Sequence, residues 1–291
     1  MSRILIVNPF ATGVTEERLA AVRVALPSAT VVRVTTRRGQ ATEIAREVSS
    51  TVGAVYVYGG DGTFNEVLNG IDSRTPVGLI PGGGTSVLPR ALGLPRDPVE
   101  CARRLAAGME RRIGLGLVNG HRFGFGAGVG LDAEIVRAVD ALGRKPDGRR
   151  PGDVTFGWTG VRTLARHRFR LDPALEVKDH GRAAFALVAN CSAYSYAGRF
   201  PVQVSPSASF DAGLDLVAPV RLRARTLPRI LTYGFSGGDR SRARDLVYVH
   251  DADRLEVACD RPLPLQADGE DLGDVSEAVF EAERDAVAVL V

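Results

Sequence analysis

The 291-residue chain is predicted to fold as an α/β domain with a parallel sheet, followed by a mostly β domain. Three observations predict this fold class. Short apolar strands alternate with helical stretches as far as residue 110, and strand-like runs dominate after that point. Glycine-rich turns directly follow two of the early strands, as happens at the carboxyl edge of an open parallel sheet.

The elements of the N-terminal half follow from this alternation. Strands are expected over residues 3–7, 30–35, 54–58 and 77–80. Helices are expected over residues 15–25, 40–49, 64–70 and 86–92. A further helix opens at Asp97, because Pro98 and Glu100 complete a capping pattern with it.

The elements of the C-terminal half are separated by turn residues. Asn119-Gly120 lies between two apolar segments and indicates a β-hairpin. Strands are expected over residues 183–189, 246–250, 255–259 and 286–291. Helices are expected over residues 132–142, 154–167 and 222–233.

Composition excludes several classes of protein. The hydrophobic fraction of 45% is too high for a disordered chain. Lys and Arg number 37 against 34 Asp and Glu, and the basic stretches lack the interleaved aromatic residues of a nucleic-acid surface, so no nucleic-acid partner is expected. The four histidines show no spacing typical of zinc ligands.

The expected location is the cytoplasm, with peripheral contact at the inner face of the membrane left open. The three cysteines are scattered and odd in number, which favours a reducing compartment. No stretch approaches the ~18–20 apolar residues of a membrane-spanning helix.

Two glycine-rich turns are candidates for a phosphate site. Residues 59–63 (GGDGT) and 81–85 (PGGGT) each follow a strand and precede a helix. Glycines let backbone N–H groups approach an anion, and the helix N-terminus adds partial positive charge. Asp61 would repel a bare phosphate, which makes sense if Mg²⁺ lies between them. The alternative is that Thr63 and Glu66 form a capping box and that the turn merely starts a helix.

The two common types of nucleotide site are excluded. The chain has no G-x-x-x-x-G-K-[ST] motif, and no lysine precedes Lys145. The same absence of lysine excludes the protein-kinase arrangement. The dinucleotide spacing G-x-G-x-x-G is not met even in the glycine-rich run 124–130.

Residues 59–70 (GGDGTFNEVLNG) resemble the GGDGTxNEVxNG signature of the diacylglycerol kinase catalytic family, which includes sphingosine kinases and bacterial soluble lipid kinases. Further resemblances follow in the family's order: Asn8-Pro9, Thr35-x-x-x-Gly39-x-Ala41, residues 81–95, Gly128-x-Gly130-x-Asp132 and Asp268-Gly269-Glu270. Because GGDG alone also occurs in NAD kinases and phosphofructokinases, these later motifs distinguish the family.

The resemblance implies a Rossmann-like domain of the NAD-kinase and diacylglycerol-kinase type over residues 1–120. A β-sandwich lipid-substrate domain would follow over residues 121–285, and residues 286–291 would return to the first domain. The implied activity is transfer of the γ-phosphate of ATP, with Mg²⁺, to a lipid hydroxyl. Diacylglycerol is the favoured acceptor and a sphingoid-like alcohol the alternative. The acceptor lipid is the expected partner, and a homodimer is left open.

The resemblance also implies roles for individual residues. The nucleotide would be lined by Asn8, Pro9, Thr12, Thr35, Gly59, Gly60, Asp61, Gly62, Thr63, Phe64, Asn65, Gly84 and Thr85. Asp61 would act through Mg²⁺ bound to ATP. Glu270 would accept the proton of the lipid hydroxyl, with Asp268 close by. The alternative for this acidic stretch is a solvated β-turn.

The sequence departs from the family pattern at two places. Ser86 stands where the family usually has asparagine, with the threonine displaced by one position. In the segment 205–216, Ala212 replaces the aspartate nearest the glycine. A structural Mg²⁺ near Asp211 and Asp215 is therefore not claimed.

Two segments are candidates for contact with a membrane. Residues 222–235 mix arginines with apolar side chains, which is typical of a helix on an anionic membrane surface. Arg144, Lys145, Arg149 and Arg150 would add electrostatic attraction. The alternative is an ordinary amphipathic helix and a solvated basic loop.

Two other functions are weighed against the lipid kinase. Residues 234–238 satisfy G-x-S-x-G, and Asp239 or Asp245 and then His250 follow in the order of a serine hydrolase. The residues immediately after this motif are basic and polar, unlike the apolar helix that a nucleophile elbow requires. The second alternative is a nucleotide-binding protein of the same fold without turnover, suggested by Ser86 and Ala212.

Overall fold

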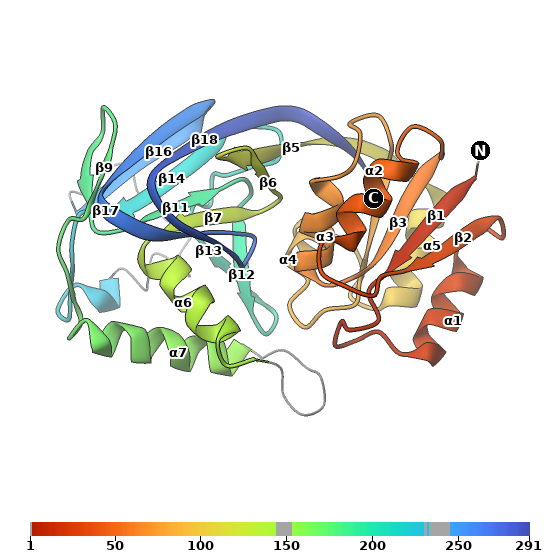
Figure 1. Cartoon of the computed structure of the whole chain (residues 1–291), viewed down its shortest axis with the longest axis horizontal. Helices are drawn as coiled ribbons and strands as arrows, with labels where there is room; N and C mark the ends of the chain where they lie inside the picture. The colour runs from red at the N-terminus through yellow and green to blue at the C-terminus, as the bar shows by residue number, and fades with distance from the viewer. Residues whose placement is uncertain (1, 144–152, 230–231, 233–244) are drawn as a thin grey trace. The chain divides into compact units, whose positions relative to one another are not determined.

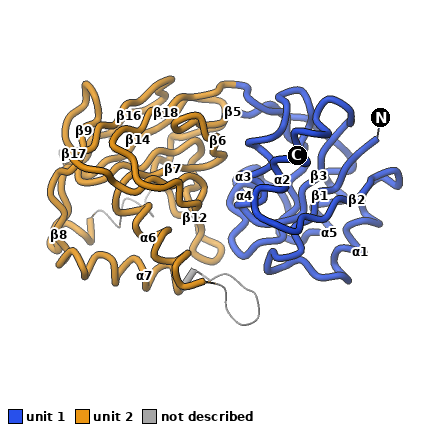
Figure 2. The backbone as a smooth tube through the Cα atoms, in the orientation of Figure 1, with its two compact units in different colours: residues 1–114, 146–150, 285–291 blue, residues 115–145, 151–284 orange. Residues whose placement is uncertain are grey.

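The computed structural model describes residues 2–143, 153–229, 232 and 245–291. Figure 2 divides the chain into two compact units. The first contains the chain up to Gly114 together with the last residues, Asp285–Val291. The second contains the described residues from Leu115 to Arg284. No helix in the described ranges is long and apolar enough to cross a membrane.

The first unit is a parallel sheet covered by helices (Figure 1). Its strands are β1 (Arg3–Val7), β2 (Thr30–Val34), β3 (Ala54–Gly59) and β4 (Val77–Pro81), in the parallel order β2–β1–β3–β4. The long last strand, β18 (Glu270–Leu290), places Val289 beside Val77. Every residue of β3 and β4 is buried, as expected for parallel strands covered on both faces. The predicted α/β architecture is confirmed.

The helices of this unit follow the expected positions closely. They are α1 (Glu16–Ala25), α2 (Gln40–Val48), α3 (Asp61–Leu68), α4 (Val87–Ala91) and α5 (Pro98–Ala107). Asp97 caps α5 as predicted, because its carboxylate accepts hydrogen bonds from the N–H groups of Val99 (3.0 Å) and Glu100 (2.9 Å). Helix α3 begins at Asp61 rather than Phe64, since Gly60 is extended and serves as its N-cap.

The second unit is mostly β and largely antiparallel. The strands of its main sheet and branches are β5 (Glu110–Val118), β6 (His121–Phe123), β7 (Gly126–Val129), β9 (Leu175–Val177), β10 (Gly181–Ala183), β11 (Ala186–Ala189), β14 (Leu214–Pro219), β16 (Leu246–Ala252), β17 (Arg254–Ala267) and β18. Strands β12 (Ala193–Ala197) and β13 (Phe200–Gln203) form a separate hairpin. Asn119 and Gly120 form the predicted turn between β5 and β6, with φ angles of 49° and 83°.

Two long helices belong to the described part of the second unit. Helix α6 (Leu131–Asp140) packs against β7 and β17, and α7 (Asp153–Arg166) packs against α6 (Figure 1). The β core contains fully buried Phe123, Leu216 and Phe280. This arrangement confirms the prediction of a β-rich C-terminal half.

Two predicted elements of the second unit are only partly right. The run 183–189 is divided between β10 and β11. Within the range 222–233, where a helix is predicted, the first two residues form strand β15 (Leu222–Arg223), which pairs with β8 (Arg170–Leu171). A helix begins only at Leu227, and residues 230, 231 and 233 lie outside the described residues. The reason is tertiary: Leu222 is 2% exposed in a cluster with Phe185, so strand pairing overrides its local amphipathic pattern.

Candidate active site

The two glycine-rich turns of the first unit lie against each other. The Gly82 N–H donates to the Gly59 carbonyl at 2.7 Å. A Cβ on Gly83 would lie 2.9 Å from the Gly60 Cα, and a Cβ on Gly59 would lie 2.8 Å from the Thr63 hydroxyl oxygen. Glycine is therefore required at these positions by close approach.

Backbone N–H groups of these turns are the candidate anion-binding groups. In the part of the chain that the structure describes, the N–H groups of Gly60, Gly83 and Gly84 make no hydrogen bond to a protein acceptor. Gly62 occupies the first turn of α3, where N–H groups have no partner within the helix. Gly84 is exposed, and a Cβ there would contact nothing within 4 Å. Such groups at a helix N-terminus suit the phosphates of a nucleotide.

The side chains expected to line the nucleotide fall into two groups. Asn8 and Thr63 meet, because Asn8 Nδ2 donates to Thr63 Oγ1 at 2.8 Å. The exposed residues are Pro9, Thr12 and Gly84, while Thr85 is partly exposed. The side chains of Thr35, Phe64 and Asn65 are 4%, 1% and 1% exposed and face the core. These three side chains therefore lie in the interior, whereas Pro9, Thr12 and Gly84 lie at the surface.

Asp61 links the two turns. Its Oδ1 accepts a hydrogen bond from the Val87 N–H at 2.7 Å, at the start of α4. The carboxylate is partly exposed beside the candidate anion-binding groups. Mg²⁺ in nucleotide sites takes one or two carboxylates together with phosphate oxygens and waters, so this donor set fits the ion.

Ser86 adopts a backbone conformation that asparagine favours. Its φ angle is 49°, in the left-handed region, and its side chain is 3% exposed. Its Oγ lies 3.4 Å from the Gly83 carbonyl oxygen. Ser86, which stands where the family usually has asparagine, is therefore a buried residue of the turn.

The capping-box alternative for residues 63–66 is wrong. Helix α3 has no side-chain cap, and Glu66 reaches another helix. Its carboxylate accepts hydrogen bonds from the N–H groups of Gly39 (2.9 Å) and Ala41 (3.1 Å), at the N-terminus of α2. Glu66 therefore joins two of the motifs that were recognised separately.

In the second unit, Asp268 is an anchor. One carboxylate oxygen accepts from the Gly124 N–H (2.6 Å), and the other accepts from Phe125 (3.0 Å) and Gly126 (3.2 Å). Asp268 is 4% exposed, so the alternative of a solvated turn is wrong for this residue. Asp268 and Gly269, with φ angles of 49° and 78°, form the two-residue turn between β17 and β18.

Glu270 comes directly after this anchored turn. It is the first residue of β18, pairs with Ala267 across the hairpin, and is 9% exposed. Its position is therefore set by a tight turn whose other end is held by three backbone N–H groups.

A polar network beside the turn was missed in part by sequence reasoning. Tyr194 donates to Asp132 Oδ2 at 2.7 Å, and Gln266 Nε2 donates to the same oxygen at 2.6 Å. Gln266 Oε1 also accepts from the Gly269 N–H at 2.9 Å, so the network reaches the turn that carries Glu270. Burial raises the pKa of Asp132, and burial and the nearby Asp132 raise the pKa of Tyr194 well above its usual range.

The spacing of glycines in β7 is the sequence signal for this network. A Cβ on Gly126 would lie 2.4 Å from the Tyr194 ring, and a Cβ on Gly128 would lie 2.5 Å from Asp132 Oδ2. Alternate residues of a strand face the same side. The two glycines therefore make room for the network on one face of β7.

The segment around Asp215 does not fit a structural metal. Asp215 is fully buried and accepts hydrogen bonds from Ser205 Oγ (2.5 Å) and the Asp251 N–H (3.0 Å), while His250 Nδ1 lies 2.8 Å from its Oδ1. Asp211 is exposed. Among the described residues no cluster of three His, Cys, Asp or Glu side chains is arranged to hold a metal.

The described residues of the serine hydrolase alternative do not form a catalytic pair. Asp245 pairs with Arg229, whereas His250 lies against Asp215. Residues 234–239 lie outside the described residues.

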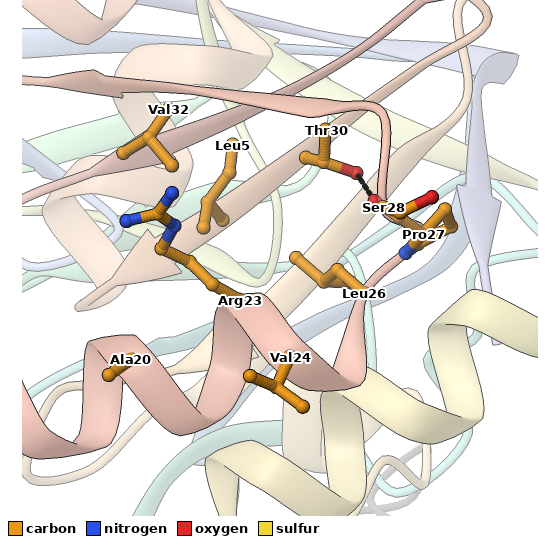
Figure 3. Close-up of a pocket in the computed structure, with 9 residues that line it drawn as sticks. All are labelled: Leu5, Ala20, Arg23, Val24, Leu26, Pro27, Ser28, Thr30 and Val32. Carbon is orange, nitrogen blue, oxygen red and sulfur yellow. Dashed lines mark hydrogen bonds between the residues drawn. The ribbon is translucent and has the colours of Figure 1, made fainter.

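A pocket of about 340 Å³ lies elsewhere in the first unit, between α1 and the strands β1 and β2 (Figure 3). It is lined by Leu5, Ala20, Arg23, Val24, Leu26, Pro27, Ser28, Thr30 and Val32. None of the predicted site residues lines it.

Comparison with known proteins agrees with the motifs. Residues 2–118 match the diacylglycerol kinase catalytic domain family, and residues 126–291 match the YegS C-terminal NAD kinase beta sandwich-like domain family. The chain is 28% identical over 244 residues to a diacylglycerol kinase of Bacillus subtilis (strain 168), covering 81% of this chain and 77% of that protein. It is 36% identical over 85 residues, 28% of each chain, to a diacylglycerol kinase of Staphylococcus saprophyticus.

The fold agrees with a solved structure. A crystal structure of a diacylglycerol kinase from Bacillus anthracis str. Sterne superimposes with a TM-score of 0.72 at 19% identity, covering 99% of this chain and 96% of that one. The two family matches together cover both units, and the matched segments carry the glycine turns and the anchored Asp268–Gly269–Glu270 hairpin. The chain therefore belongs to the diacylglycerol kinase catalytic domain family with a YegS-type C-terminal domain, and it is a lipid kinase of that family.

Proposed function

We propose that this lipid kinase transfers the γ-phosphate of ATP to the hydroxyl group of diacylglycerol and releases phosphatidic acid. The observation that carries the proposal is the position of Glu270, buried at the end of a hairpin that Asp268 anchors. The similarity to the Bacillus subtilis protein named diacylglycerol kinase, over 81% of this chain, supports the choice of acceptor.

The first unit holds the nucleotide in this proposal. The N–H groups of Gly60, Gly83 and Gly84 donate to the phosphates, and the N-terminus of α3 adds partial positive charge. Asp61 would hold Mg²⁺ beside the same phosphates, and the ion would supply positive charge to the phosphoryl group. Asn8 fixes the hydroxyl of Thr63 at the base of the turn.

Glu270 is the general base. Its carboxylate accepts the proton of the lipid hydroxyl while that oxygen forms a bond to the γ-phosphorus and the bond to the bridging oxygen of ADP breaks. Asp268 is a positioning residue, because both of its oxygens are committed to backbone N–H groups. The acceptor lies in a bilayer, so the enzyme is proposed to act at the cytoplasmic face of the membrane, where ATP is present.

The test is transfer of γ-labelled phosphate from ATP, with Mg²⁺, to a panel of lipids in detergent micelles. The panel contains diacylglycerol, monoacylglycerol, a sphingoid base and ceramide. We expect label in diacylglycerol from the wild type and a loss of at least about 100-fold with Glu270→Gln, since general bases contribute about 10²–10⁴-fold. ATP binding, measured by calorimetry, should be unchanged in the variant.

Other outcomes are equally informative. If the label goes mainly to the sphingoid base, the acceptor is that alcohol and not diacylglycerol. Full activity in Glu270→Gln would remove Glu270 from the chemistry and leave the acceptor assignment intact.

A further inference from the structure

Helix α7 exposes large apolar side chains to solvent. Trp158 is 70% exposed, Val161 is 48% exposed and Phe156 is 40% exposed. Trp158, Val161 and Ala165 follow a spacing of three and four residues, which places them on one face of the helix. This apolar stripe requires an explanation, because large apolar side chains are seldom grouped on a free surface.

The opposite face of α7 shows that the stripe is not needed for packing. Thr159 and Thr163 are 8% and 1% exposed, so the buried face carries threonines while the tryptophan lies outside. The inner face is also held by His167, whose Nε2 lies 2.8 Å from Glu134 Oε2 of α6. The inner side also carries Leu164, which packs in the apolar cluster of Phe185 and Leu222, so α7 is packed on the unit without its outer stripe.

The charges that flank the stripe are positive. Arg162 and Arg166 lie on the exposed side of α7, and neither makes an ion pair within the described residues. Other arginines of the same unit do pair with carboxylates, as Arg137 does with Asp271 and Arg223 with Asp172. The outer face of α7 thus combines a tryptophan, aliphatic side chains and two available guanidinium groups.

We infer that the outer face of α7 docks on a bilayer that contains anionic lipids. Trp158 and Val161 enter the boundary between headgroups and acyl chains, and Arg162 and Arg166 bind lipid phosphates. The inference rests on the proposed function in one respect: an acceptor held in a bilayer requires the enzyme to meet that surface. In the described part of the segment 222–235, Leu222 is buried and Arg223 and Arg229 are paired with Asp172 and Asp245, so these residues are not available for the contact. Residues 230, 231 and 233–235 of that segment lie outside the described residues. Arg144, Lys145, Arg149 and Arg150 lie outside the described residues.

Trp158 makes the inference directly measurable, because it is the one tryptophan of the sequence. The full chain is titrated with vesicles of phosphatidylcholine alone, or mixed with phosphatidylglycerol, and tryptophan emission is recorded. We expect a shift to shorter wavelength with the anionic vesicles, and quenching when the acyl chains carry bromine. Co-sedimentation without any change in Trp158 emission would place the membrane contact elsewhere, and no binding to either vesicle would overturn the inference altogether.

Variants separate the apolar contribution from the charged one. Val161→Ser should weaken binding to anionic vesicles, whereas Val24→Ser, at an 87% exposed valine of α1, is the matched control and should not. Arg162→Gln with Arg166→Gln should weaken binding by about 25-fold, at about fivefold per arginine. Equal effects of Val161→Ser and Val24→Ser would contradict the docking face.

The micelle assay keeps this inference distinct from the proposed function. Wild type and Val24→Ser should both label diacylglycerol in micelles, where no bilayer is present. If the wild type fails to do so, the acceptor is wrong, while the emission of Trp158 still reports whether α7 enters a bilayer.

Discussion

A single buried carboxylate, Asp268, fixes the turn that carries the proposed base. It receives three hydrogen bonds from the consecutive N–H groups of Gly124, Phe125 and Gly126. Hydrogen bonds to a charged acceptor each stabilise a protein by about 1.5–3 kcal/mol, more than neutral ones. The arrangement therefore makes Asp268 a structural determinant as well as part of the motif.

Asp268→Asn should lower the free energy of unfolding by about 2–3 kcal/mol, because the amide presents a donor to at least one of these N–H groups. Urea unfolding with an unchanged m value would measure the loss. Asp253→Asn is the control: the Asp253 side chain is largely exposed and, among the described residues, pairs with Arg284 alone, so a loss of about 0.5 kcal/mol or less is expected. Equal losses in both variants would argue against the anchoring role.

The residues of this turn were predictable from the sequence, but their environment was not. Asp-Gly indicates a turn by itself. The N–H groups that donate to the Asp268 carboxylate, however, lie 142–144 positions away in the chain. Tyr194 and Gln266 were missed for the same reason, since neither lies in a recognisable local motif. Only the alternate glycines of β7 pointed toward them.

Among the elements, the contact between the two glycine turns allows packing and binding to be tested separately. Gly83→Ala would force a Cβ to within 2.9 Å of the Gly60 backbone and should destabilise the protein by about 1–3 kcal/mol. Gly84→Ala meets nothing within 4 Å and should leave the unfolding temperature nearly unchanged. If Gly84 borders bound phosphate, this second variant should nevertheless weaken ATP binding, which calorimetry would show. Unchanged affinity would remove Gly84 from the nucleotide site.

Helices and strands were predicted well where the local sequence pattern alone determines them. The strands of the first unit agree with the sequence because their apolar runs are short and clearly bounded, and α5 agrees because Asp97 caps it. The helix expected over 222–233 begins only at Leu227, because β8 supplies a pairing strand for Leu222 and Arg223, and Leu222 is buried beside Phe185. The capping box is absent because the Glu66 carboxylate accepts hydrogen bonds at the N-terminus of α2, which is remote in sequence.

For the molecule as a whole, the C-terminal residues complete the first unit. Ala286–Leu290 are all buried, Val289 pairs with Val77, and the Val291 N–H donates to the Met109 carbonyl at 2.8 Å. No periodicity in the sequence predicts which sheet the last strand joins. That connection was expected only from the family resemblance.

Deleting residues 286–291 should abolish stable folding of the first unit. Burial of Val287, Val289 and Leu290 contributes about 1.5–3 kcal/mol each, a total comparable to the whole stability of a domain. Soluble yield and thermal unfolding would measure the effect. Deleting Val291 alone is the control and should cost about 1 kcal/mol, the value of one backbone hydrogen bond. A truncated chain that unfolds at the wild-type temperature would refute the expectation.

The late position of Val289 also matters while the protein is being made. The strands β1 to β4 leave the ribosome early, yet the residue that flanks Val77 is synthesised 175 positions after Gly114. At about 5–20 residues per second, translation of that stretch takes about 9–35 s. During this interval β4 has an open edge, which is a template for pairing with other chains. Nascent chains of this kinase are thus exposed to misassembly until translation ends, and slow codons in the second half would lengthen that exposure.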